Sequence, residues 1–240
     1  MRALLLLLLV PALALAQGPS ITRDLGSVQI GPRILGEPAF AFELDALSQA
    51  EVSRPGWPVT TTRAGTANCI GGGVAAANTA CVGTFGLESF PSGVNGRSAA
   101  DAHTVSTVGW PTSAVRICLQ YTAASSGMPS GNNVFLDART TSTLVGYSLW
   151  RNSANQLNLQ LVGSGGTSNI TSTALDWSST ATVCAEWGDG DVALYRNGAL
   201  VASAAGQHMP DGVRPSATIG NSAFSSSPAN GSIRLLRVSE

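Results

Sequence analysis

The chain has 240 residues, enough for one large domain or two small ones, and a formal net charge of −1. Only 11% of its residues are charged, and all thirteen basic residues are arginines that form no stripe, which excludes an electrostatic surface for nucleic acid. Glycine, serine, threonine, alanine and asparagine dominate the rest, and lysine is absent. This composition favours many short strands joined by tight turns.

The first sixteen residues have the anatomy of a secretory signal peptide. Arg2 gives a basic start, an apolar run extends from Ala3 to Leu15, and Ala14-Leu15-Ala16 forms a small-x-small cleavage pattern. The run is short for a membrane span, so we expect a secreted or cell-surface protein with no stable span after processing. The alternative is an N-terminal anchor that is not cleaved.

The region between the signal peptide and residue 101 is expected to be irregular. Residues 17–36 are predicted to form a leader, and residues 37–101 to form a strand followed by loops. FAFELDAL (residues 40–47) alternates like a strand, whereas residues 57–95 are rich in glycine, alanine, threonine and asparagine and show no helical period.

Four cysteines in an exported chain fit two disulfides, although they allow three pairings. Cys69 and Cys81 lie close together in a glycine-rich stretch and are expected to staple that loop. Cys118 and Cys184 would then pair across the fold. The two histidines are isolated, so no cysteine and histidine spacing indicates zinc, and we expect no metal and no cofactor.

From residue 102 onward, runs with strand periodicity recur about every 8–12 residues without a helical pattern between them. Alternation puts apolar side chains on one face of each run and polar ones on the other. An Asn197-Gly198 pair inside VALYRNGALVAS is a strong hairpin signal. The sequence therefore predicts an all-β, antiparallel β-sandwich (jelly roll) over residues 102–240. The other runs are HTVSTVGW, AVRICLQYT, NVFLDART, LVGYSLWRN, QLNLQLVG, ATVCAEW, SATIGN and GSIRLLRVS.

The order of these runs resembles the pentraxin and laminin-G-like branch of the concanavalin A-like jelly rolls. AVRICLQYT and ATVCAEW match two strands that this family joins by a disulfide, which here implies a bond between Cys118 and Cys184. DVALYRNGALVAS, ATIGN and GSIRLLRVS match its hairpin and its last two strands, so the resemblance covers about half of the chain. Pentraxins bind calcium through an acidic run after the I-x-G strand. The matching stretch, IGNSAFSSSPANG, contains no acid, so the resemblance does not imply that calcium site.

A second resemblance lies upstream of the jelly roll. AFELDALSQAEVSRPGWPVTTTRAGTA, VAAANTA and GLESFPSGVN are similar to the N-terminal part of phage tail-fibre-like virion proteins, in which such a region precedes a laminin-G-like jelly roll. This resemblance implies a virion or tail-associated subunit. The signal peptide and the cysteines point instead to export, because virions assemble in a reducing cytoplasm.

Three carboxylates lie close together at the end of the second of the paired strands and in the turn after it. If Cys118 lies opposite Cys184 in antiparallel strands, Glu186 lies opposite Arg116 and forms an ion pair worth about 1 kcal/mol or less. The acids are spaced E-x-x-D-x-D, and Asp189 and Asp191 lie in a turn, whereas glycosidases of this fold use E-x-D-x-x-E on one strand. A retaining glycosidase also needs two carboxyl groups about 5–5.5 Å apart. We therefore predict no enzymatic activity and interpret the two aspartates as a solvated turn rather than a cation site.

The runs at residues 144–152 and 156–163 predict a binding surface. If their hairpin turns at residues 152–155, Trp150 pairs with Leu157 in the core. Amide groups, a guanidinium and an aromatic ring, which suit sugar hydroxyl groups, then gather on the wetted face. The four predicted ligand-binding residues are Tyr147, Arg151, Asn158 and Gln160.

The sequence thus predicts an exported, non-catalytic protein that binds a glycan or another surface polymer. The alternative is a virion subunit, whose partners would be other virion or surface subunits. A glycan hydrolase is a third reading, but it lacks a suitable pair of carboxylates. The sequence leaves open whether the protein is a homo-oligomer.

Overall fold

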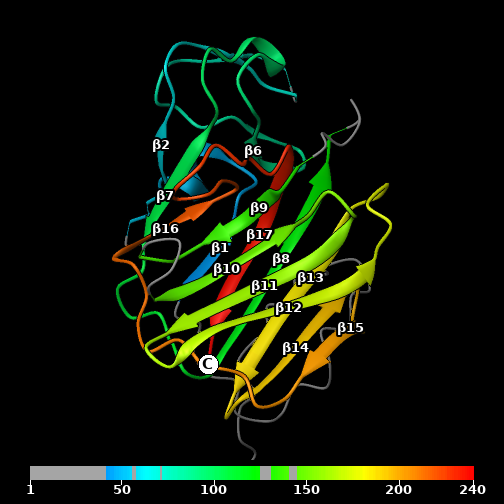
Figure 1. The fold of residues 1–240 in the computed structure, drawn as a ribbon. Helices are drawn as coiled ribbons and strands as arrows, with labels where there is room; N and C mark the ends of the chain where they lie inside the picture. Colours follow the sequence, from blue (N-terminus) through cyan, green and yellow to red (C-terminus); the bar gives the residue numbers. More distant parts are fainter. Residues whose placement is uncertain (1–41, 56–57, 71, 125–130, 141–144) are drawn as a thin grey trace, which may run out of the picture.

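The computed structural model describes residues 42–55, 58–70, 72–124, 131–140 and 145–240 (Figure 1). The predicted signal peptide and leader, residues 1–36, lie outside the described residues. The helical elements within these ranges are α1 (Gln49–Val52) and a 3₁₀ turn, η1 (Val94–Gly96). Among the described residues, none of the helices combines the length and the apolar character that a membrane span requires.

Two antiparallel sheets form a sandwich, which confirms the predicted fold class. In Figure 1, strands β9 to β12 of the second sheet lie in front of β17, β8 and β13 of the first. The first sheet has the order β15 (Ala199–Ala204), β14 (Asp191–Arg196), β13 (Ala181–Gly188), β8 (Val115–Ala123), β17 (Gly231–Ser239), β6 (Gly86–Ser89) and β5 (Val82–Gly83), and β1 (Phe42–Asp45) also pairs with β17. The second has the order β12 (Gly166–Ala174), β11 (Gln156–Gly163), β10 (Gly146–Arg151), β9 (Asn133–Asp137), β16 (Ser216–Ile219), β7 (Ala102–Ser106) and β2 (Thr60–Thr62).

The core lies between the inner faces of the two sheets. Alternation along β8 and β13 turns apolar side chains inward, and Ile117, Leu119 and Ala185 are fully buried. Leu149 and Leu159 of the second sheet are also fully buried and belong to the same apolar cluster. Each sheet therefore has one face in the core and one outer face.

The pairing of β8 with β13 follows the register expected from the cysteines. Cys118 lies opposite Cys184 and the two form a disulfide on the outer face of the first sheet. Glu186 lies opposite Arg116, and its Oε1 is 2.9 Å from the Arg116 Nε. Both side chains are about one third exposed, so solvent weakens this ion pair.

The residues before Ala102 are part of the same sandwich. Strands β1 and β6 both pair with β17, and β2 pairs with β7. The boundary predicted between residues 101 and 102 therefore does not separate two sheets. A two-stranded ribbon pairs β3 (Ala67–Asn68), which directly precedes Cys69, with β4 (Val74–Ala75), which lies within the loop that the Cys69–Cys81 disulfide closes.

The two disulfides are expected to stabilise the fold to different extents. They span 66 and 12 residues, and a longer closed loop removes more entropy from the unfolded chain. We expect the Cys118→Ser/Cys184→Ser double variant to lose about 4 kcal/mol of unfolding free energy and the Cys69→Ser/Cys81→Ser variant about 3 kcal/mol. Chemical denaturation measures both. An equal or larger loss for the shorter loop would contradict the entropic account.

Candidate functional site

The β10–β11 hairpin closes in a different register from the one expected. The Asn152 N–H donates to the Gln156 carbonyl, so the loop is residues 153–155, with Asn155 at a φ of +61°. A three-residue loop that ends in a left-handed residue is a common hairpin closure. Trp150 consequently lies opposite Asn158, not opposite Leu157. A change of register by one residue exchanges the two faces of a strand, so the faces assigned to β10 are reversed.

Two of the four predicted ligand-binding residues therefore lie in the core. Tyr147 is fully buried, and its ring centroid lies 4.8 Å from that of Trp187 in an edge-on contact. Burial raises the pKa of the Tyr147 hydroxyl. Arg151 is 1% exposed, and burial lowers its pKa. The interpretation that Tyr147 and Arg151 lie on the wetted face is wrong, because the hairpin register turns both side chains inward.

The outer face of the second sheet carries a row of polar side chains in cross-strand register. Asn169, Gln160, Ser148 and Asp137 are successive partners across β12, β11, β10 and β9. A second row contains Thr171, Asn158 and Trp150. We call the outward side chains of these rows, together with Arg139, the amide face: Asp137, Arg139, Trp150, Asn158, Gln160, Asn169 and Thr171.

Hydrogen bonds connect the first row of the amide face. The Gln160 Nε2 donates to the Asn169 Oδ1 over 3.0 Å, and the Gln160 Oε1 accepts from the Arg139 Nη1 over 2.5 Å. Arg139 holds Asp137 through two bonds, from Nε over 2.8 Å and from Nη2 over 2.7 Å. The Asp137 side chain is fully buried, and the Ala223 N–H also donates to it. The row thus consists of polar groups whose directions are fixed by their neighbours.

The second row adds an aromatic ring to fixed amide groups. The Thr171 hydroxyl donates to the Asn158 Oδ1 over 2.7 Å, and the Asn158 Nδ2 donates to the Gln156 carbonyl over 2.8 Å. Trp150 lies beside Asn158 and is half-buried. Sequence reasoning placed Trp150 in the core. Asn155 carried the signal that could have corrected this, because asparagine favours the left-handed position of a three-residue loop.

A second aromatic ring lies next to Arg139. Phe224 is 43% exposed, and the guanidinium carbons of Arg139 and Arg214 lie 5.7 Å and 5.9 Å from its ring centroid. The loop that carries Phe224 is tied to the amide face, because the neighbouring Ala223 N–H donates to Asp137. The amide face therefore has two aromatic side chains, Trp150 in its second row and Phe224 beside Arg139.

The acids of the β13–β14 hairpin do not form a hydrolytic site. Glu186 is paired with Arg116, and Asp189 and Asp191 are exposed around a tight turn, in which Asp189 has a φ of +51°. Glu186 and Asp191 both line a shallow surface hollow. Glycoside hydrolysis requires one carboxyl group that burial keeps protonated, and none of these three is buried.

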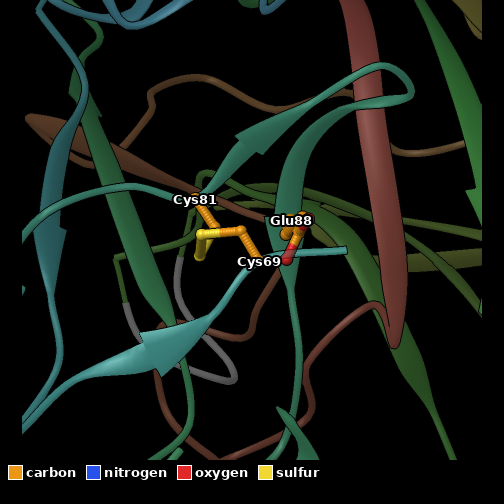
Figure 2. A group of neighbouring side chains, drawn as sticks. All are labelled: Cys69, Cys81 and Glu88. Carbon is orange, nitrogen blue, oxygen red and sulfur yellow. A yellow bond between two sulfur atoms is a disulfide. The ribbon is translucent and has the colours of Figure 1, made fainter. Parts of the chain in front are cut away.

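Cys69, Cys81 and Glu88 lie close enough together to resemble a metal site (Figure 2). The two sulfur atoms are bonded to each other, whereas a metal requires free thiolates. The Glu88 carboxylate accepts from the Ile70 N–H over 2.6 Å and from the Arg97 Nη2 over 3.0 Å. The group is therefore a disulfide packed beside a carboxylate that is already paired.

Glu88 belongs to a buried charge network that joins β6 to the loops around it. Asp101 lies between two cations, 2.7 Å from the Arg63 Nη1 and 2.6 Å from the Arg97 Nε. Arg97 also contacts Glu88, so two guanidinium groups balance two carboxylates. All four side chains are at most 2% exposed. Balanced charge and dense hydrogen bonding are what allow such groups to remain buried.

His103 lies beside this network and is fully buried. Its Nε2 lies 2.8 Å from the Glu88 carbonyl, which can only accept, so Nε2 carries the hydrogen and Nδ1 accepts from the Thr61 hydroxyl over 2.9 Å. Burial lowers the pKa of His103, against the opposing effect of Asp101. Both ring nitrogens of His103 already have hydrogen-bond partners, and the Asp101 carboxylate is paired with two arginines. His103 and Asp101 therefore cannot act as the histidine and the aspartate of a catalytic triad.

Comparison with known proteins assigns the fold to a family. A laminin-G-type model described as the concanavalin A-like lectin/glucanases superfamily matches residues 121–240, half of the chain. This confirms the laminin-G-like resemblance, whereas the tail-fibre resemblance stays a prediction. A search of curated proteins found no match.

Solved structures share the fold at low identity. The binding domain of botulinum neurotoxin serotype D/C VPI 5993 is 14% identical over 83% of this chain and 48% of its own, with a TM-score of 0.55. A botulinum neurotoxin type C structure, from work on cell entry through two ganglioside molecules, is 14% identical over 76% and 43%, with a TM-score of 0.50. The CBM40 of the Ruminococcus gnavus IT-sialidase is 17% identical over 53% and 76%, with a TM-score of 0.45. At these identities the likeness shows the fold alone.

Replacing Arg151, which is buried, or Arg139, which is paired with Asp137, by methionine should change the unfolding free energy in opposite directions. The Arg151 Nε and Nη1 are buried without a hydrogen-bond partner in the described part of the chain, so Arg151→Met should add about 1 kcal/mol of unfolding free energy. Arg139→Met leaves the buried Asp137 carboxylate without its cation and should cost about 3 kcal/mol. Chemical denaturation measures both changes, and a loss for Arg151→Met would contradict this account.

His103 should make stability depend on pH. Its pKa in the folded protein is below the ordinary value of 6.5, so the unfolded chain binds the proton more tightly. The stabilisation is complete above about pH 6.5 and is lost as the pH falls below it, by at most about 1.4 kcal/mol per pH unit. The loss between about pH 7.5 and 5.5 should be smaller in His103→Gln, in which this proton is missing. Equal losses in the two proteins would contradict the assignment.

Proposed function

Because the chain belongs to the concanavalin A-like lectin/glucanases superfamily, we propose that it is an exported, non-catalytic protein that binds a glycan on the amide face. The observation that carries the proposal is the hydrogen-bonded row that runs from Asn169 through Gln160 and Arg139 to Asp137. A sugar presents several hydroxyl groups in fixed directions. A protein surface that matches them needs donors and acceptors that are already held in place.

A sugar-binding surface usually also has an aromatic ring beside its hydrogen-bonding groups. One face of a pyranose ring is lined with C–H groups and packs on an aromatic ring. The half-buried Trp150 and the exposed Phe224 offer such rings on and beside the amide face. Two of the residues expected from the sequence, Asn158 and Gln160, belong to this face. Trp150 and Arg139 take the roles that Tyr147 and Arg151 were predicted to fill.

Two further observations support a binding protein outside the cell. Both cysteine pairs are disulfides, which persist in oxidising compartments, and a signal peptide is predicted for residues 1–16. The structurally similar serotype D/C neurotoxin domain is a binding domain, and cell entry of the type C toxin depends on interaction with two gangliosides, which are glycolipids. These relatives support a glycan as the ligand class but do not specify which glycan.

A glycan array probed with the full chain and with single variants tests the proposal. Gln160→Ala removes the amide that links Asn169 to Arg139, and Trp150→Ala removes the ring, so each should weaken binding at least tenfold, or about 1.4 kcal/mol. Gln120→Ala is the matched control, because Gln120 is also half-buried but lies on the outer face of the first sheet. It should bind like the wild type.

Two results would contradict the proposal. One is equal loss of binding in Gln160→Ala and Gln120→Ala, with all variants folded by circular dichroism. The other is no binding to any glycan together with assembly into particles, which would support the virion alternative instead.

A further inference from the structure

Within the described ranges, one side of the sandwich ends in two strand edges that pair with no further strand. Strand β15 ends the first sheet and β12 ends the second, and the two lie next to each other (Figure 1). Neither strand contains a charged residue or a proline. Edge strands that remain unpaired are normally short or carry such residues, because their free N–H and C=O groups would otherwise pair with another strand. The strands at the opposite ends of the two sheet orders, β5 and β2, are only two and three residues long.

The ladder between β14 and β15 shows which backbone groups of β15 are free. The two-residue turn Asn197-Gly198 makes Arg196 and Ala199 the hydrogen-bonded pair that closes the hairpin. Pairs alternate from there, so Leu200, opposite Tyr195, directs its N–H and C=O away from β14. A bulge then interrupts the alternation of the ladder, and after it Ala202 pairs with Leu194.

The bulge sets the spacing of the outward groups. Because Val201 is the extra residue, Ser203 is the next position whose N–H and C=O point away from β14. The outward positions are therefore Leu200 and Ser203, three residues apart instead of the usual two. A partner strand must show the same spacing to use both, and a second copy of β15 does.

We propose that β15 pairs antiparallel with β15 of a second copy, with a two-fold axis between Val201 and Ala202. In this register Leu200 of each copy lies opposite Ser203 of the other. Each such pair exchanges both of its backbone hydrogen bonds, so the first sheet continues across the dimer. The bulge then makes the edge specific for its own copy, because a regular strand cannot match the spacing.

The side chains are also complementary in this register. Leu200 is 57% exposed, and it lies on the outer face of the first sheet with Ser203, since their partners Tyr195 and Ala193 lie there. A surface hollow of about 650 Å³ lies beside Ser203 and is lined mainly by small and apolar residues. The pairing lays the exposed Leu200 of one copy over the hollow of the other, and symmetry does this twice. Trp187, Val192, Ala193 and Ala204 are part of the lining, and the carboxylates of Glu186 and Asp191 also line the hollow.

The dimer does not depend on glycan binding. The amide face belongs to the second sheet, whereas the interface continues the first, so both amide faces remain available. A bivalent protein would bind a surface that displays many copies of a glycan more strongly than a monomer does. The dimer can therefore be tested without any ligand.

Sedimentation velocity of the full chain over a range of micromolar concentrations is the first test. We expect the wild type to approach twice the monomer mass as its concentration rises. Leu200→Lys puts a charge on the edge and removes the side chain that covers the hollow, so it should raise the dissociation constant of the dimer at least about tenfold. Val108→Lys, at a residue that is 82% exposed outside this edge, is the matched control and should dimerise like the wild type.

Cross-linking tests the register. None of the four native cysteines is free, so new cysteines report only on their own contacts. The Leu200→Cys/Ser203→Cys variant should form a covalent dimer on a non-reducing gel, while each single variant should form much less. The two new cysteines lie about 10 Å apart along one strand, too far to bond within a copy. A wild type that stays monomeric, or a double variant that cross-links no more than the single ones, would overturn the proposal.

Discussion

The pairing of β8 with β13 is the constraint on which the first sheet depends. These two strands lie near the middle of the sheet, and the Cys118–Cys184 disulfide joins them at one register. A slip by one residue would turn Ile117 and Leu119 to the solvent and Arg116 into the core. The buried apolar face of each strand and the covalent bond therefore favour the same alignment. Strands β14 and β15 follow from that alignment through two tight hairpins.

The second sheet has no such covalent bond, and a turn sets its register instead. Asn155 in the left-handed conformation closes the β10–β11 hairpin so that Trp150 and Asn158 face outward. The same turn places Tyr147 in the core against Trp187 of the first sheet. One loop residue thus decides both how the two sheets pack and which side chains are available to a ligand. The proposed function depends on this choice, because the amide face exists only in this register.

Charge is used differently in the two polar regions of the molecule. Around β6, Arg63, Arg97, Glu88 and Asp101 satisfy one another in the interior, where they hold loops in place and are inaccessible to a ligand. On the amide face, Arg139 and Asp137 also neutralise each other. The Asp137 side chain is fully buried, but the Arg139 side chain is partly exposed and donates to Gln160. The first arrangement is structural, and the second keeps polar groups ready for binding.

The sequence by itself determined the features that rest on alternation and on short-range turns. It predicted the sandwich, the inward face of β8 and β13 and the Asn197-Gly198 hairpin, because strand periodicity and a two-residue turn are local properties. The partner of Cys118 followed from the spacing of the cysteines and the family resemblance, and the partner of Arg116 from the register that this disulfide implies. Only the tertiary structure decided which face of β10 is buried. The sequence between β10 and β11 is compatible with a loop of three or of four residues, and the two loops give strand registers that differ by one residue. Burial of Arg151 and the charge network were equally out of reach. Both features depend on contacts between residues of separate loops and strands, and no local sequence pattern predicts which of these residues come into contact.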